Sequence, residues 1–154
     1  MSEGIKIVAT NRKAGRDFNL EDRYEAGLAL LGTEIKSIRA GRVNLSDGYV
    51  QVRDSELWLL NVHIARYDPS GGYGHEPLRA RKLLLHRREI NRLIGRVTER
   101  GYTIVPTRLY LKHGRAKVEI ALARGKRKYD KRQAIAKRDS EREIERALRE
   151  RYRK

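Results

Sequence analysis

The last thirty residues of the chain, 125–154, contain too few large hydrophobic residues to build a core of their own. Their large aliphatic residues are Ile135, Ile144 and Leu148, and their aromatic residues are Tyr129 and Tyr152. So small a set cannot bury enough apolar area to offset the entropy lost when the chain becomes ordered. We therefore expect two parts: a folded body over residues 1–124, and a tail over residues 125–154 that is disordered, or helical once it binds a partner.

Both parts are basic. The chain has 36 Lys and Arg against 20 Asp and Glu, a net charge of +16, of which the tail carries +7 and the body +9. This excess predicts a polyanionic partner, either nucleic acid or an anionic membrane surface. We expect no membrane partner, because no apolar run approaches ~20 residues and the most basic stretch has no apolar face to insert. Residues 1–10 show no secretory signal, which predicts a cytoplasmic location.

Alternating hydrophobic residues indicate that the body consists mainly of β-strands. The clearest alternation runs over Arg115–Ala123, where Val, Ile and Leu occupy every second position. His113-Gly114 would join this strand to Tyr102–Leu111 as a hairpin, and Pro106 would fit an edge or a bulge.

Further strands are expected earlier in the chain. A second hairpin would pair Tyr49–Arg53 with Glu56–Arg66 through a turn at Asp54-Ser55. Tyr24–Gly32 and Glu34–Arg39 would supply two more short strands.

One helix interrupts the strands, because hydrophobic residues recur at helical spacing over His86–Thr98. Asp68–Glu76, rich in glycine, is expected to be a flexible loop. About six short strands with one main helix before the last hairpin favour a mainly β fold, a small closed or partly open barrel of the oligonucleotide-binding (OB) type.

Enzymatic function finds no support in the sequence. The chain has no cysteine, which excludes a disulfide scaffold, a thiolate zinc site and a cysteine nucleophile. The four histidines, His63, His75, His86 and His113, do not have metal-ligand spacing, and no complete phosphate-binding loop is present. Glu25, Glu34 and Asp47 have no spacing that indicates acid–base catalysis. We therefore expect no enzyme activity, no cofactor and no metal.

The cations of the body could neutralise phosphates, and an exposed tyrosine could stack on an unpaired base. These candidate RNA-binding residues are Asn11, Arg12 and Lys13, then Lys36 and Arg39, then Arg79, Arg81 and Lys82, and finally Tyr110, Lys112 and Lys117. The alternative interpretation is an ordinary solvated face with tyrosines that fill the core. For a single lysine that alternative is preferable, but the unbalanced total charge favours a polyanion.

The tail begins with a basic run behind a glycine: Gly125, Lys126, Arg127, Lys128, Tyr129, Asp130, Lys131 and Arg132. Such runs are most often solvated extensions. Here Ile144, Leu148 and Tyr152 follow at four-residue steps, which favours a helix that folds on an anionic partner. Structured RNA is favoured over DNA, because the body contains no recognition-helix motif.

Several strings of the sequence are similar to those of a known family. They are Asn11-Arg12-Lys13-Ala14, Tyr24-Glu25-Ala26-Gly27-Leu28, Gly32-Thr33-Glu34-Ile35-Lys36-Ser37, Arg39-Ala40-Gly41, Asn44-Leu45-Ser46-Asp47, Arg81-Lys82-Leu83-Leu84-Leu85-His86 and the run from Gly125 to Arg132. In order and together, they resemble the small protein B family, the SsrA-binding proteins. Tyr129 stands where some members have histidine, and the tail beyond Arg132 is only generically similar.

The resemblance implies an OB-type barrel and a partner, transfer-messenger RNA. Members bind its tRNA-like domain and deliver it to stalled ribosomes, where the tail enters the empty message channel of the small subunit near the decoding centre. By analogy, the residues that form or support the RNA face are Asn11, Lys13, Phe18, Glu25, Lys36, Leu83 and Lys117. Three roles are open to Glu25: accepting a hydrogen bond from a base, accepting one from a 2′-hydroxyl, or orienting a neighbouring lysine.

The resemblance also implies a role for the start of the tail. Gly125 to Arg132 would begin the ribosome-binding segment, with Tyr129 stacking on a base of the decoding centre. We expect the protein to act as a monomer on the RNA. The alternative function is that of a general basic, ribosome-associated or translation-factor protein that binds structured RNA through the same barrel.

Overall fold

The computed structural model describes residues 4–67 and 75–125 of the protein. Its elements follow one another as β1 (Ile5–Thr10), α1 (Arg12–Asp17), β2 (Phe18–Leu28), α2 (Gly32–Arg39), β3 (Val43–Asn44), β4 (Tyr49–Arg53), β5 (Glu56–Leu60), β6 (His63–Ile64), β7 (Arg81–Leu84), α3 (Arg87–Arg100), β8 (Thr103–Lys112) and β9 (Arg115–Gly125). Within these residues no helix is long and apolar enough to cross a membrane. The tail beyond Gly125, and with it the expected helix that folds on a partner, lies outside the described residues.

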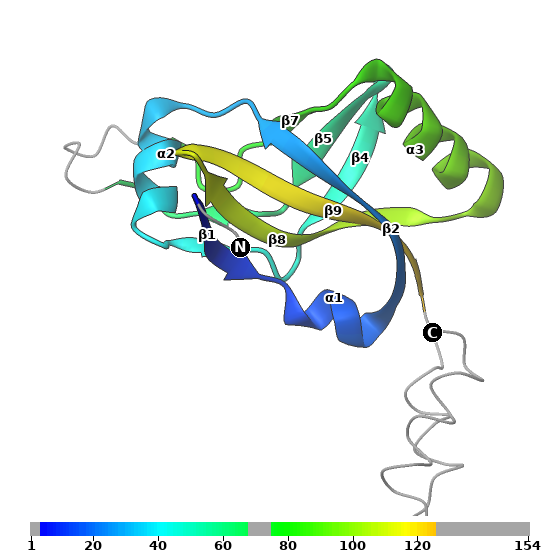
Figure 1. Ribbon diagram of the computed structural model, residues 1–154, viewed down its shortest axis with the longest axis horizontal. Coiled ribbons are helices and arrows are strands. Elements are labelled where there is room, and N and C mark those ends of the chain that lie inside the picture. Colours follow the sequence, from blue (N-terminus) through cyan, green and yellow to red (C-terminus); the bar gives the residue numbers. More distant parts are fainter. Residues whose placement is uncertain (1–3, 68–74, 126–154) are drawn as a thin grey trace, which may run out of the picture.

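The strands pair into a closed ring. Strands β8, β4, β5, β7, β2 and β9 are hydrogen-bonded in this order, and β9 also pairs with β8. Strand β1 pairs with the second half of β8, while β3 and β6 form a separate small sheet. Helices α2 and α3 lie at opposite ends of the view in Figure 1. This arrangement confirms a mainly β fold with one main helix.

Both predicted hairpin turns are confirmed. Asp54 and Ser55 have φ of 50° and 62°, and His113 and Gly114 have φ of 51° and 78°. Two successive residues with positive φ are the mark of the two-residue turns whose twist matches that of paired strands. The register of the β8–β9 pairing shifts between Pro106 and Arg108, as expected for a proline at a bulge.

The core fills the inside of the ring. Val118, Ile120 and Leu122 of β9 are fully buried, as expected from their alternation. Helix α3 contributes Ile90 and Leu93 from one side, which agrees with the helical spacing read from the sequence. Of the β9 residues that alternate with this core, Lys117 and Glu119 are half-buried, whereas Ala121 and Ala123 are fully buried.

The expected strand over Glu34–Arg39 is wrong, because these residues form α2. The buried side of this helix consists of Glu34, Ser37 and Ile38, which follow helical spacing although two of the three are polar. The Glu34 carboxylate also accepts from the backbone N–H of Leu31 at 2.8 Å, which satisfies a free donor at the helix start. A hydropathy pattern cannot show a helix whose buried side is largely polar.

Other boundaries also differ from the prediction. Strand β2 begins at Phe18 rather than Tyr24 and ends at Leu28 rather than Gly32. Four elements, β1, α1, β3 and β7, were not expected from the sequence, and the expected strand Glu56–Arg66 is divided into β5 and β6. Of the predicted loop Asp68–Glu76, only His75 and Glu76 fall among the described residues.

Candidate nucleic-acid interface

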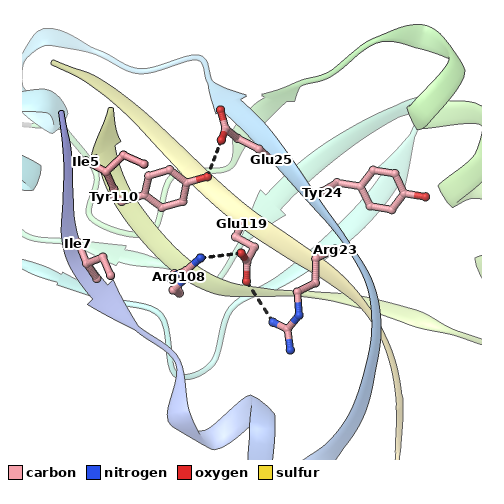
Figure 2. Close-up of a pocket in the computed structure, with 8 residues that line it drawn as sticks. All are labelled: Ile5, Ile7, Arg23, Tyr24, Glu25, Arg108, Tyr110 and Glu119. Carbon is pink, nitrogen blue, oxygen red and sulfur yellow. Dashed lines mark hydrogen bonds and ion pairs between the residues drawn. The ribbon is translucent and has the colours of Figure 1, made fainter. Parts of the chain in front are cut away.

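A groove of about 550 Å³ lies on the outer surface of β1, β2, β8 and β9 (Figure 2). Strand alternation turns the polar side chains of these strands outward, opposite the core. The lining residues are Ile5, Ile7, Arg23, Tyr24, Glu25, Arg108, Tyr110 and Glu119. Basic, acidic, aromatic and aliphatic groups therefore share one open surface, a composition suited to a nucleotide.

Glu25 and Glu119 are cross-strand partners in the β2–β9 pairing, a like-charge arrangement that is unfavourable by itself. Neighbouring donors compensate it. Glu119 accepts hydrogen bonds from Arg23 Nη1 at 3.0 Å, Arg108 Nη2 at 2.9 Å and Thr107 Oγ1 at 2.6 Å. Partial burial by itself raises the pKa of Glu119, but these donors outweigh it and the pKa lies below its ordinary value. Glu119 is therefore an anion that fixes two guanidinium groups at the groove.

Glu25 has a similar environment at the other end of the groove. Its Oε1 accepts from the Tyr110 hydroxyl at 2.8 Å and from Lys112 Nζ at 3.4 Å. Partial burial favours a higher pKa, but the hydrogen bond from Tyr110 and the charges of Lys112 and Lys117 outweigh it and lower the pKa of Glu25. Among the described residues both contacts use Oε1, so Oε2 is left to accept from a ligand.

Tyr110 is more buried than expected for a stacking residue, with only 6% of its surface exposed. Burial raises its pKa, and so does its hydrogen bond to the ionised Glu25. The neutral phenol therefore persists as a donor to Glu25. Its ring lies 5.8 Å from the Arg108 guanidinium, within cation–π range.

A second group of expected residues surrounds α1, in a pocket of about 300 Å³. Phe18 and Tyr49 supply its aromatic side chains, and Lys13 pairs there with Asp47 at 3.2 Å. Asn11 is buried and structural: its Oδ1 caps the helix at Ala14 N, while its Nδ2 donates to the carbonyls of Leu45 and Pro106. Arg12, the next residue, is exposed.

The remaining expected residues lie elsewhere. Lys36 and Arg39 are exposed on α2, and Lys36 Nζ lies 5.4 Å from the centre of the Tyr67 ring. Lys82 is half-buried on β7. Leu83 is fully buried in the core, so it can support an RNA face only from beneath.

The structure thus divides what the sequence presents as one set. It brings together Glu25, Tyr110, Lys112 and Lys117, whereas Asn11, Lys13 and Phe18 lie around α1, and Lys36 and Arg39 lie on α2. Gly125 ends β9, whereas the other expected tail residues, Lys126, Arg127, Lys128, Tyr129, Asp130, Lys131 and Arg132, lie outside the described residues. Arg23, Arg108 and Glu119 were missed, although the outward alternation of Arg108 on its strand was a usable signal.

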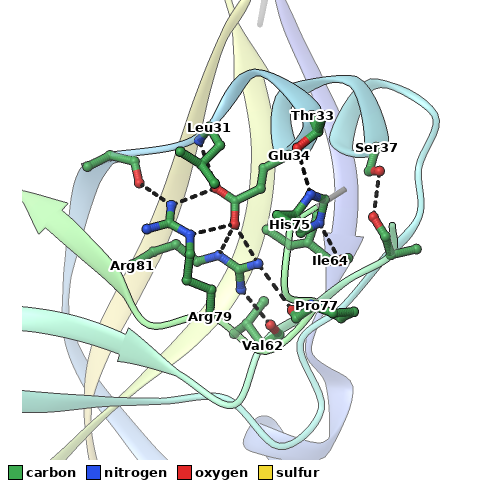
Figure 3. A network of polar contacts seen from close by, with 12 residues as sticks. Leu31, Thr33, Glu34, Ser37, Val62, Ile64, His75, Pro77, Arg79 and Arg81 are labelled. Atoms are coloured by element: carbon green, nitrogen blue, oxygen red, sulfur yellow. Dashed lines mark hydrogen bonds and ion pairs between the residues drawn. The ribbon is translucent and has the colours of Figure 1, made fainter. Parts of the chain in front are cut away.

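Arg79 and Arg81 do not belong to the basic surface on which they were expected (Figure 3). Arg81 has no exposed surface and donates to Glu34 Oε2 at 2.8 Å and to the carbonyls of Val62 and Pro77. Arg79 donates to both oxygens of the same carboxylate, at 3.1 and 2.7 Å. Burial of Glu34 would raise its pKa, but the two arginines and the Leu31 N–H lower it.

His75 completes this buried network. Its Nε2 lies 2.8 Å from the Ile64 carbonyl and must donate to it, which leaves Nδ1 to accept from the Thr33 hydroxyl at 2.9 Å. The His75 imidazole therefore links Ile64 of β6 to Thr33 of α2. Among the described residues, no group of three His, Cys, Asp or Glu side chains could hold a metal ion.

Comparison with known proteins identifies the family of this chain. The family model described as SmpB protein matches residues 8–150. The chain belongs to the SmpB family. An SsrA-binding protein of Roseiflexus sp. (strain RS-1) is 63% identical over 150 residues, which cover 97% of this chain and 95% of that protein. The SsrA-binding protein of Geobacillus kaustophilus (strain HTA426) is 58% identical over 146 residues, 95% of this chain and 94% of that protein.

A solved structure gives the same result. A chain of "tmRNA-SmpB: a journey to the center of the bacterial ribosome" superposes with a TM-score of 0.67 at 42% identity. The match covers 86% of this chain and 94% of that chain. The family resemblance read from the sequence strings is therefore confirmed.

Proposed function

We propose that this protein binds the tRNA-like domain of transfer-messenger RNA and delivers it to stalled ribosomes, acting as an adaptor that catalyses no reaction. The observation that carries the proposal is the 63% identity, over nearly the whole chain, to a protein named for SsrA binding. The match to an SmpB chain described together with tmRNA and the ribosome supports the same two partners. A ribosomal partner implies a cytoplasmic location.

The closed ring of strands is, in this proposal, a barrel of the OB type. Its support is the order of strand pairing, in which β9 joins both β2 and β8. In OB-type folds a sheet surface and the loops beside it bind nucleic acid. A closed ring also holds the outward side chains of its strands rigidly, because it leaves few free edges.

The groove of Figure 2 is the body's main RNA contact in this proposal. Lys112 and Lys117 would neutralise phosphates at one end, and the two arginines held by Glu119 would do so at the other. Ile5 and Ile7, 37% and 51% exposed, would cover the apolar face of a base or ribose. Glu25 Oε2 would accept from a base N–H or a 2′-hydroxyl, both of which RNA offers in unpaired regions.

The tail is the second RNA contact. Its support is the composition of residues 125–154, which carry a net charge of +7 and too few hydrophobic residues for a core. Truncation after Arg124 should therefore leave binding to transfer-messenger RNA intact and abolish peptide tagging on stalled ribosomes. Loss of RNA binding on truncation would contradict the division into body and tail.

A competition experiment tests the proposed partner. The full chain is titrated with labelled transfer-messenger RNA in the presence of bulk tRNA at physiological salt, because charge-driven binding is strongest at low salt and hides selectivity. A strong preference for transfer-messenger RNA is the expected result. Equal competition by bulk tRNA would favour the alternative, a general basic protein that binds structured RNA.

A further inference from the structure

Side chains from four parts of the chain meet near the end of β9. The Tyr102 hydroxyl, directly before β8, donates to both oxygens of Glu21 on β2, at 2.9 and 3.0 Å. The same carboxylate lies 3.4 Å from Arg124 Nη2 on β9 and 3.7 Å from Arg96 Nη2 on α3. We call Glu21, Arg96, Tyr102 and Arg124 the β9 anchor.

The Tyr102 ring adds a second set of contacts. The guanidinium of Arg96 lies 4.9 Å from the ring centre and that of Arg124 lies 5.3 Å from it, both within cation–π range. Tyr102 is 7% exposed, so its ring is packed as well as paired. The Tyr102 phenol and the Glu21 carboxylate thus connect α3, β2, the start of β8 and the end of β9.

Arg124 is the residue directly before Gly125, where β9 ends opposite Phe18. The basic run of the sequence starts at Gly125. We infer that Tyr102 and Glu21 are positioning residues for the tail: they hold the end of β9 and so fix the point at which the tail is attached. This inference rests on the proposed function.

The physical reason is the coupling of two contacts. When the body is bound to one RNA, the tail's search for a second site is an intramolecular event whose efficiency depends on how its attachment point is placed. A fixed attachment point lowers the entropy cost of the second contact. None of the anchor residues lines the groove of Figure 2, so the anchor can be changed without removing a groove residue.

The test uses Tyr102→Phe, which keeps the ring but removes its hydrogen bond, and Glu21→Gln, which removes the charge. Glu56→Gln is the matched control, because it breaks the ion pair with Arg87 away from the end of β9. Each full-length variant is assayed for its Kd toward the tRNA-like domain and for tagging on stalled ribosomes. Loss of a hydrogen bond to a charged group predicts a fall of about tenfold in tagging, with the Kd little changed.

A second readout separates positioning from general stability. The chain has no cysteine, and a side chain at Gly125 would meet no atom within 4 Å, so Gly125→Cys accepts a nitroxide label. Arg115→Cys, exposed at the other end of β9, is the reference site. In the anchor variants the label at position 125 should become more mobile while the label at position 115 does not change.

The other possible outcomes distinguish failure of the inference from failure of the proposed function. Unchanged mobility at position 125, or unchanged tagging by both anchor variants, would overturn the inference alone. Equal mobility gains at positions 115 and 125, or an equal tagging loss in Glu56→Gln, would show a merely structural role and overturn it too. A wild-type chain that does not tag stalled ribosomes would instead overturn the proposed function, and the inference with it.

Discussion

Glu34→Gln should be one of the most destabilising single substitutions in this protein. The carboxylate and Arg81 are both fully buried, and the pair is bonded at 2.8 Å. Glutamine keeps the shape of Glu34 but places an amide NH₂ against guanidinium N–H groups, so Arg81 becomes a buried cation without a counter-charge. Removing one partner of a buried ion pair costs ~3–5 kcal/mol.

The structure places the effect at the lower end of that range. Arg81 keeps its hydrogen bonds to the carbonyls of Val62 and Pro77, at 2.7 and 3.1 Å. Arg79, the other partner, is 33% exposed and can turn toward water. We therefore expect the free energy of unfolding to fall by ~3 kcal/mol, a large part of the ~5–15 kcal/mol of a typical domain.

The assay is urea unfolding followed by the fluorescence of Trp58, the only tryptophan of the chain. Glu56→Gln serves as control, because its ion pair with Arg87 is partly exposed, at 25% and 52% of the two side chains, and should contribute at most ~1 kcal/mol. The dependence on urea should keep its slope, so that the midpoint reports stability. If Glu34→Gln loses no more than the control, the buried pair does not stabilise the fold as argued.

Three further predictions concern acid, RNA binding and packing. The pKa of Glu34 is lowered in the folded chain, so its contribution to the free energy of unfolding is fully present above the ordinary pKa of 4.5. This contribution is lost as the pH falls through the folded pKa. The urea midpoint of the wild type should therefore drop more steeply in acid than that of Glu34→Gln. Glu25→Gln should weaken binding to the tRNA-like domain by about tenfold in a filter-binding assay. Loss of the negative charge alone would instead tighten binding to RNA. Tighter binding by the variant would therefore exclude the acceptor role of Glu25. Gly48→Ala should lower the free energy of unfolding by ~1–3 kcal/mol in the same urea assay, because the added Cβ would lie 2.6 Å from Val62 Cγ2. Gly95→Ala, in the middle of α3 where a Cβ meets no atom within 4 Å, should stabilise the fold by ~0.5–1 kcal/mol. Equal effects of the two substitutions would refute the packing argument.

The sequence was most informative where one side of an element is purely apolar. The strand Arg115–Ala123 and α3 were predicted for this reason, and both hairpin turns were predicted from the residues between their strands. It was misleading at α2 and β7, whose buried positions include Glu34 and Arg81. In the sequence each of these two residues reads as an exposed polar position, and only the fold shows that Arg81 donates hydrogen bonds to the Glu34 carboxylate.

The candidate site was predicted as a set of residues but not as a surface. Tyr110 and Lys117 lie on the two strands of one predicted hairpin, but Glu25 is distant in sequence, and only the pairing of β9 with β2 brings it beside them. Charge and motif can name cations, but the register decides which of them can meet one RNA segment.

Many basic side chains of the body are held in fixed ion pairs. Among the described residues, Glu21, Glu34 and Glu119 each pair with two arginine side chains, and Glu25 pairs with Lys112. At the groove, Glu119 orders Arg23 and Arg108 before any ligand arrives, so less side-chain entropy is lost on binding.

Glu119→Gln raises the net charge by one and releases both arginines. Non-specific RNA binding depends on charge alone and should strengthen slightly. Binding to the tRNA-like domain depends on the order of the guanidinium groups and should weaken, so the ratio of the two affinities should fall. Glu56→Gln makes the same change in charge outside the groove and should leave the ratio unchanged. The measurement is a pair of Kd values, for the tRNA-like domain and for bulk tRNA, at one salt concentration. If Glu119→Gln strengthens both equally, the groove binds by charge alone and its carboxylates have no part in selection.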